Sequence, residues 1–92
     1  MTRISRNVVI VNDRGLHARA SAKFVTLVSR LPDGLHVEVE KDGQCVTGTS
    51  IMGLMMLGAA KGSQITVHVA GEDADKALDK LVGLVVDGFG ED

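Results

Sequence analysis

The sequence predicts a two-layer α+β sandwich in which helices cover one face of a sheet, with elements in the order β-α-β-β-α-β-α. Residues 35–40 and 65–69 alternate between apolar and polar side chains, as strands with one buried face do. Residues 18–31 and 74–85 carry apolar side chains at helical spacing, so these helices must cover the buried sheet face. The 92 residues, 45% of them hydrophobic and 24% charged, suit one globular domain spanning residues 1–92.

A turn separates the first strand from the first helix. Residues 8–11 form a short β-branched run, and the Asn-Asp-Arg-Gly sequence at residues 12–15 favours a turn after it. The helix is expected to begin at Ala18. Pro32 ends it near Leu31, because the residue before a proline disfavours helical geometry.

A hairpin and a short helix follow. Asp42-Gly43 is a strong hairpin signal that joins the second strand to a third strand at residues 44–49. Ser50 and Gly58 bracket a short helix, the serine as its N-cap and the glycine after its last turn. The fourth strand then leads to the last helix, for which Asp73 is the expected N-cap.

Composition argues against several classes of function. Ten Lys and Arg stand against 12 Asp and Glu, and there is no Trp or Tyr, so we expect no nucleic-acid partner. The longest nearly apolar stretch, residues 51–60, is shorter than the roughly 20 residues that span a bilayer, which argues against membrane insertion. The single cysteine, Cys45, has no internal disulfide partner and favours a reducing, cytoplasmic location.

His17 lies where the turn meets the first helix, a position that favours anions. The first N–H groups of a helix lack intrahelical partners, so the amides of Ala18 and Arg19 suit phosphate oxygens. The same positive potential disfavours the imidazolium form and leaves His17 as an uncharged nucleophile. Arg19 adds a guanidinium suited to phosphate, and Gly15 allows the chain to turn sharply.

These features suit a histidine that accepts a phosphoryl group from a partner and then gives it away. The sequence around it holds no Walker-type loop and no second catalytic base, so we expect a carrier and not a stand-alone enzyme. An ordinary helix-capping histidine is the alternative. Arg19, Lys23 and Arg30 form a basic stripe that is either a docking face for an acidic partner or a solvated helix face.

Two separated segments resemble one family. The segment Gly15-Leu16-His17-Ala18-Arg19 resembles the active-site segment of HPr, the histidine-containing phosphocarrier of the bacterial phosphoenolpyruvate-dependent phosphotransferase system. The segment Ser50-Ile51-Met52-Gly53 resembles that family's regulatory-serine segment. The resemblance implies an open-faced sandwich with a four-stranded antiparallel sheet and three helices on one face. Residues 60–65 and 88–92 look similar to the nitrogen-related NPr-type paralogue.

The resemblance also implies partners. Enzyme I would phosphorylate His17 on Nδ1, an enzyme IIA component would receive the phosphoryl group, and Arg19 would assist the transfer. The carrier would serve either the sugar-uptake branch or the nitrogen-related branch of the system. The carrier would be a monomer without cofactor or metal. Ala20 stands where the family usually has Pro, so we expect the helix start to survive with more freedom and the transfer rate to be affected.

For Ser50 the resemblance implies regulatory phosphorylation by an HPr kinase/phosphorylase. The family often has Lys before this serine, whereas this chain has Thr49, and a helix cap without regulation is the alternative.

The short helix has more apolar residues than one buried face needs. Leu54 and Leu57 suit the core, which leaves Ile51, Met52 and Met55 to be exposed. The resemblance implies that these three residues, together with Lys23, form a docking patch beside His17. The alternative is that all of these apolar residues are core.

Three further residues are expected to have no site chemistry. His36 and His68 occupy polar positions of two strands, where they could face each other, and are predicted to lie on the solvated face of the sheet. Two histidines without a carboxylate or cysteine partner make a poor metal site. Cys45 is expected to be a packing residue.

Two other functions remain open on the sequence. The segment Asp13-Arg14-Gly15-Leu16 is similar to the turn of ACT-type small-molecule regulatory domains, which have the order β-α-β-β-α-β. Such a domain would not account for the third helix predicted here. A phosphorylated adaptor that docks and regulates, without onward transfer, is the second.

Overall fold

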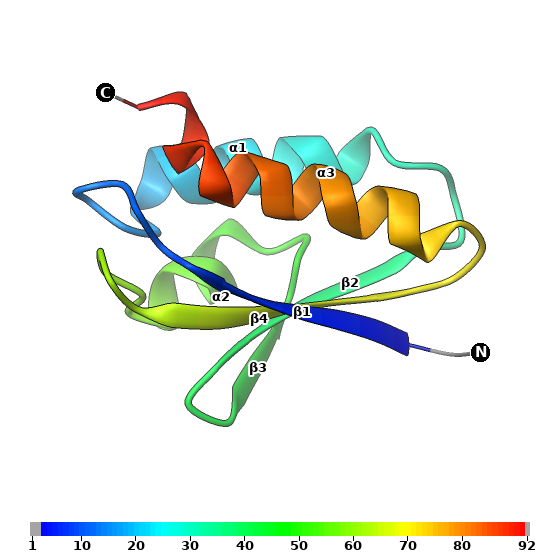
Figure 1. Ribbon diagram of the computed structural model, residues 1–92, viewed down its shortest axis with the longest axis horizontal. Helices are drawn as coiled ribbons and strands as arrows, with labels where there is room; N and C mark the ends of the chain where they lie inside the picture. Colours follow the sequence, from blue (N-terminus) through cyan, green and yellow to red (C-terminus); the bar gives the residue numbers. More distant parts are fainter. Residues whose placement is uncertain (1–2, 92) are drawn as a thin grey trace.

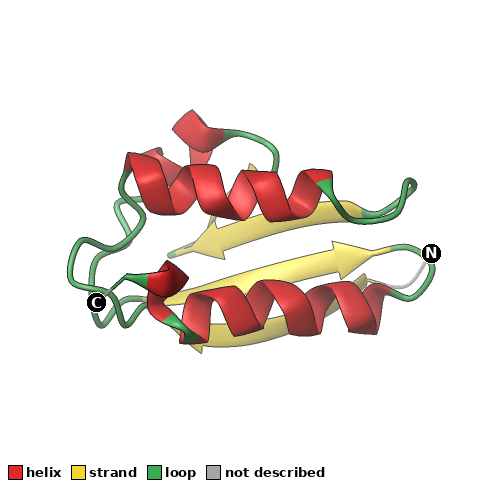
Figure 2. Ribbon diagram, turned by 90° about the horizontal axis from the view of Figure 1, so that it is seen from above, coloured by secondary structure: helices red, strands yellow, loops and turns green. Residues whose placement is uncertain are grey.

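The computed structural model describes residues 3–91 and has the expected two layers. Figures 1 and 2 show the helices on one face of the sheet, with α1 and α3 running side by side above it. The elements are β1 (Arg3–Val9), α1 (Ala18–Ser29), β2 (His36–Lys41), β3 (Gln44–Thr47), α2 (Ile51–Met56), β4 (Gln64–Ala70), α3 (Ala74–Val86) and a short 3-10 turn, η1 (Gly88–Gly90). None of the helices within this described range is long and apolar enough to cross a membrane.

The sheet confirms the predicted antiparallel architecture. Its strand order is β1-β4-β2-β3, and all three pairings are antiparallel. β4 therefore lies between β1 and β2, and its register brings Ile65 opposite Val8 and Val67 opposite Val39. The alternation of the strands places these apolar side chains on the helix-covered face.

The core lies between the sheet and the helices. Phe24 of α1, Leu54 of α2 and Leu81 of α3 are almost wholly buried against the strands. Burying a side chain of this size contributes roughly 1.5–3 kcal/mol, so each helix is held mainly by its apolar stripe. Phe89 of η1 is buried as well, and it fixes the end of the chain against the domain.

The first strand differs from the prediction in position. It begins at Arg3 and ends at Val9, whereas the β-branched run predicted a strand over residues 8–11. Pairing with β4 starts at Arg3 opposite Ala70, and polar side chains suit this edge strand because its outer face meets solvent. Ile10 continues the pairing through its backbone, since its N–H donates to Ser63 O at 2.8 Å and its carbonyl accepts from Gly62 N–H at 2.8 Å.

The predicted helix caps have mixed outcomes. Ser50 caps α2 as expected, because its Oγ accepts a hydrogen bond from Gly53 N–H at 2.9 Å. Gly58, just beyond the helix, has the positive φ of +66° that suits its predicted role. Asp73 occupies the N-cap position of α3 as predicted, but its φ of 58° is left-handed and its side chain makes no capping hydrogen bond to the described residues. A capping side chain normally depends on an extended backbone at that position.

The open sheet face also corrects the sequence analysis. His68 lies opposite Glu38, and His36 lies opposite Ala70, so the two histidines do not face each other. His68 is not solvated either, because it lies on the central strand and is only 6% exposed. Cys45 is exposed, so the expectation that it packs was wrong.

Candidate active site

The loop before α1 is held rigidly against the chain that follows α2. Gly15 adopts a φ of +62°, and a Cβ built on it would lie 2.2 Å from the backbone oxygen of Ala59. Only glycine fits this approach. Leu16 N–H donates to the same Ala59 oxygen at 2.9 Å, and Asn12 Nδ2 donates to the Gly15 carbonyl at 2.9 Å. The backbone that leads into residue 17 is therefore fixed from two sides.

His17 is the N-cap residue of α1. Its backbone is extended, with φ −72° and ψ −179°, and its Nδ1 accepts a hydrogen bond from Arg19 N–H at 3.3 Å. Its carbonyl accepts from Ser21 N–H at 2.9 Å, which starts the helical pattern. The side chain is 24% exposed, so the ring is partly sheltered but reachable. The expected helix start at Ala18 is confirmed, and Ala20 is buried in its first turn.

Glu91 contacts the other nitrogen of the ring. Its Oε2 lies 2.6 Å from His17 Nε2, while its Oε1 accepts from Asn12 Nδ2 at 3.0 Å. The hydrogen bond with Asn12 is the largest cause of a lowered pKa at Glu91, and the hydrogen bond with His17 is the next largest. The carboxylate is therefore ionised at neutral pH. An ionised carboxylate only accepts hydrogen bonds, so the hydrogen of a neutral His17 ring resides on Nε2. Nδ1 therefore carries the unprotonated lone pair, the one that accepts the hydrogen bond from Arg19 N–H.

Glu91 and Asn12 were not predicted as site residues from the sequence. Glu91 is 74 residues from His17 along the chain, and no spacing pattern signals such a contact. The end of the chain is brought there by η1, in which the buried Phe89 has a left-handed φ of 58°. Lys23 Nζ donates to the Phe89 carbonyl at 2.6 Å. Lys23, predicted as a docking residue, thus also holds the segment that carries Glu91.

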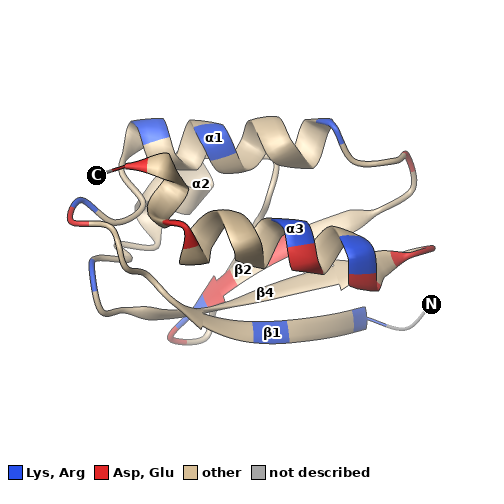
Figure 3. Ribbon diagram, turned by 45° about the horizontal axis from the view of Figure 1, so that its top comes forward, with Lys and Arg blue, Asp and Glu red and all other residues tan. Residues whose placement is uncertain are grey.

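An open pocket of about 300 Å³ surrounds the ring. Arg14 and Arg19 supply positive charge on its walls, and Asp13 and Glu91 supply negative charge. Lys61 Nζ lies 3.0 Å from Asp13 Oδ1 and offsets that carboxylate. Figure 3 shows the basic residues of the loop and of the first part of α1 near this end of the molecule. Arg14 is a further basic residue here that the sequence analysis did not single out.

With this geometry in view, the comparisons with known proteins decide the family. The sequence model described as "PTS HPr component phosphorylation site" matches residues 4–87. The chain belongs to the HPr phosphocarrier family of the phosphotransferase system.

Relatives and solved structures agree with this assignment. The chain is 45% identical over 84 residues to the phosphocarrier protein HPr of Pseudomonas aeruginosa, covering 91% of this chain and 92% of that protein. It is 37% identical over 91 residues to the phosphocarrier protein NPr of Shewanella violacea, covering 99% and 98%. The crystal structure of HPr from Bacillus anthracis superimposes with a TM-score of 0.84 at 36% identity, covering 92% of this chain and 99% of that one. Membership of the HPr family overturns the ACT-type alternative.

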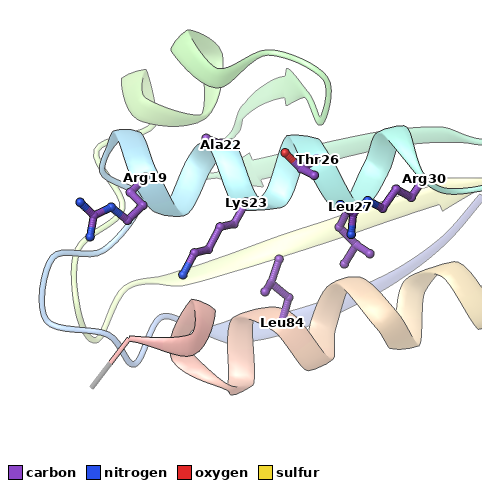
Figure 4. A pocket seen from close by; sticks show the side chains of 7 residues that line it. All are labelled: Arg19, Ala22, Lys23, Thr26, Leu27, Arg30 and Leu84. Atoms are coloured by element: carbon purple, nitrogen blue, oxygen red, sulfur yellow. The ribbon is translucent and has the colours of Figure 1, made fainter.

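The short helix α2 bears the predicted exposed patch. Leu54 and Leu57 are buried as expected, whereas Ile51, Met52 and Met55 are 40%, 72% and 43% exposed, so the alternative that all are core is wrong. Met56, which the sequence analysis left unassigned, is 68% exposed. We call Ile51, Met52, Met55 and Met56 the α2 patch. α2 packs against α1 and lies beside its N-terminal part (Figures 1 and 4).

The basic stripe of α1 lies along a groove on the opposite side of that helix. Arg19, Lys23 and Arg30 line the groove together with Leu84 of α3, and Figure 4 shows Lys23 pointing toward the chain end while Leu84 points into the groove. Arg19 thus belongs both to this groove and to the pocket at His17.

Proposed function

We propose that His17 accepts a phosphoryl group on Nδ1 from phosphorylated Enzyme I and passes it to an enzyme IIA component. The observation that carries this proposal is the contact of Glu91 with Nε2 at 2.6 Å, which leaves Nδ1 as the nucleophilic nitrogen at the helix start. Family membership supports a carrier role and does not specify the partners.

The chemistry requires little of this chain beyond positioning. The Nδ1 lone pair attacks the phosphorus of the phosphorylated donor, the N–P bond forms, and the donor's bond to phosphorus breaks with its electron pair leaving on the donor. The Nε2 hydrogen stays on Nε2, where the Glu91 carboxylate faces it and stabilises the positive charge that the ring gains. Transfer to the acceptor reverses these steps.

The new phosphoryl oxygens meet donors that the site already holds. The Arg19 N–H, which donates a hydrogen bond to Nδ1 at 3.3 Å, becomes available to donate to a phosphoryl oxygen once Nδ1 is phosphorylated. The Ala18 N–H belongs to the same helix start and can donate to the phosphoryl oxygens as well. The Arg19 guanidinium lines the pocket and can bind the same oxygens. The partner proteins supply the rest of each active site, so the chain acts as a covalent intermediate and not as an independent enzyme.

Docking of the partners is proposed at the α2 patch. Its exposed methionines adapt to differently shaped surfaces, which suits a carrier that binds a donor and an acceptor in turn. Lys23 lies on α1 one turn beyond Arg19 and adds positive charge for acidic partners. We expect the carrier to work as a monomer in the cytoplasm, where its exposed Cys45 thiol stays reduced.

Ser50 is proposed as a regulatory phosphorylation site for an HPr kinase/phosphorylase. Its hydroxyl caps α2, the helix that bears the patch. A phosphate there adds negative charge beside the docking surface and opposes acidic or phosphorylated partners.

The function is tested by incubating the chain with Enzyme I and labelled phosphoenolpyruvate. We expect acid-labile label on the protein and its loss in His17→Ala, with His36→Ala as the control that keeps it. Adding enzyme IIA should then remove the label from the carrier. Label without onward transfer to IIA proteins of either the sugar or the nitrogen-related branch would favour the adaptor alternative.

A further inference from the structure

A second cluster of reactive side chains lies on the open face of the sheet. Glu40 of β2, Cys45 of β3 and His68 of β4 each direct a potential ligand atom to one place, and these atoms lie within 4.8 Å of one another. The helices and His17 belong to the other layer, and Figure 3 shows the acidic residues of β2 in the sheet below them. We propose that these three side chains form a Zn²⁺ site.

The backbone frame of this cluster is rigid. Glu40 and Cys45 are direct partners in the β2–β3 ladder, and Glu40 lies opposite Thr66 in the β2–β4 ladder. His68 is two residues further along β4, so it reaches Glu40 diagonally on the same face. Three adjacent strands therefore supply one ligand each, and a site on strands is held better than one on loops.

The donor set matches zinc chemistry. Imidazole nitrogen, thiolate sulfur and carboxylate oxygen all bind Zn²⁺ at about 2.0–2.3 Å, which places tetrahedral donors about 3.3–3.8 Å apart. The present separations, all within 4.8 Å, exceed this spacing by at most about 1.5 Å, a difference that side-chain rotation has to close. Zn²⁺ with the Cys45 thiolate and the Glu40 carboxylate is electrically neutral, and water completes the fourth position.

Ser5 supports the ligand role of His68. Its Oγ lies 2.6 Å from Nδ1, and Nε2 lies 2.8 Å from Glu40 Oε1. A carboxylate only accepts hydrogen bonds, so in a neutral His68 ring Nε2 carries the hydrogen and donates to Glu40, and Nδ1 accepts from the Ser5 hydroxyl. With Zn²⁺ bound, the ring hydrogen would lie on Nδ1 and donate to Ser5 Oγ, and the Nε2 lone pair would face the metal. The Ser5 hydroxyl can act as hydrogen-bond donor in the first arrangement and as acceptor in the second. The ring keeps one hydrogen, so binding releases a single proton, that of the Cys45 thiol.

The local charges favour a cation. Glu40 lies directly opposite Cys45 in the β2–β3 ladder, and Glu38 lies two residues from Glu40 on the same face of β2, so two carboxylates place negative charge near the thiol. Arg3 Nη1 lies 3.2 Å from Glu38 Oε1 and offsets that carboxylate. Glu40 is paired with His68, and the metal would replace the hydrogen that now lies between them.

Titration of the reduced full-length protein with Co²⁺ and Zn²⁺ tests the site. Co²⁺ reports thiolate ligation through a charge-transfer absorption band, and calorimetry gives the Zn²⁺ affinity. We expect the band in the wild type, its loss in Cys45→Ser, and a Zn²⁺ affinity at least about tenfold weaker in Cys45→Ser and His68→Gln. Cys45 is exposed, so the serine variant keeps the fold.

Two control variants separate this site from adventitious binding. His36 is an exposed histidine of the same strand as Glu40, and His36→Gln should leave the Zn²⁺ affinity unchanged. His17→Ala removes the other carboxylate-bound imidazole, and the Co²⁺ band should persist in it. An unchanged Zn²⁺ affinity in Cys45→Ser, or a thiolate band absent from the wild type, would overturn the proposal.

Discussion

Replacing Gly15 with alanine tests how the fold positions His17. The added Cβ would lie 2.2 Å from the Ala59 oxygen and 2.8 Å from the Ala60 Cα, both backbone atoms that cannot rotate away. The turn must therefore move, and this movement breaks the hydrogen bond from Leu16 N–H to Ala59 O.

A matched glycine separates the steric effect from the backbone effect. Gly58 has nearly the same φ, +66° against +62°, but apart from its chain neighbours a Cβ there would meet no atom of residues 3–91 within 4 Å. Gly58→Ala should therefore lower the free energy of unfolding only by the cost of holding alanine in a left-handed backbone conformation, about 1 kcal/mol. Gly15→Ala costs that term plus a buried backbone hydrogen bond worth about 1–3 kcal/mol, so we expect a loss of about 2–4 kcal/mol.

Urea unfolding at neutral pH measures both variants. A domain of this size should lose about 4–8 °C in Tm per kcal/mol, so thermal unfolding provides a second measurement. Gly15→Ala should also slow phosphorylation of His17 by Enzyme I, because the N-cap residue moves with the turn, whereas Gly58→Ala should not. Equal destabilisation by the two substitutions would refute the steric argument.

Three further predictions concern the caps, the chain end and the α2 patch. Ser50→Ala removes the hydrogen bond to Gly53 N–H and should destabilise the protein by about 1 kcal/mol in urea unfolding. Hydrogen bonds from Asn12 and His17 lower the pKa of Glu91 below its ordinary 4.5. The ionised carboxylate therefore stabilises the folded state above pH 4.5, and this stabilisation is lost as the pH falls through the lowered pKa. The difference in unfolding free energy between wild type and Glu91→Gln should therefore shrink in acid; a constant difference would contradict this. Met52 is 72% exposed, so Met52→Asp should slow transfer from Enzyme I while changing the unfolding free energy by less than about 0.5 kcal/mol. Normal transfer in that variant would exclude Met52 from docking.

Local chemistry made most of the fold predictable. Strict alternation in β2 and β4 and helical spacing in α1 and α3 each imply one buried face, and the structure places those residues in the core. The surplus of apolar residues in α2 likewise predicted that Ile51, Met52 and Met55 are exposed, although it did not single out Met56. β1 was misplaced because an edge strand tolerates the polar residues that begin at Arg3.

Contacts between segments that are far apart in the chain could not be predicted from the sequence. Glu91 reaches His17 only because η1 turns the chain end back, and Glu40 and Cys45 reach His68 only because the strand order is β1-β4-β2-β3. Local spacing carries no information on strand order. The position of His17 at a helix start could be predicted, whereas the carboxylate that selects its nitrogen could not.

The central claim is that the contact with Glu91 leaves Nδ1 of His17 to carry the phosphoryl group. Nitrogen-15 NMR of the protein with labelled histidine rings, after phosphorylation by Enzyme I, identifies the nitrogen bonded to phosphorus. We expect phosphorus coupling at Nδ1 of His17 and a hydrogen on Nε2. Coupling at Nε2, or at another residue, would contradict this account.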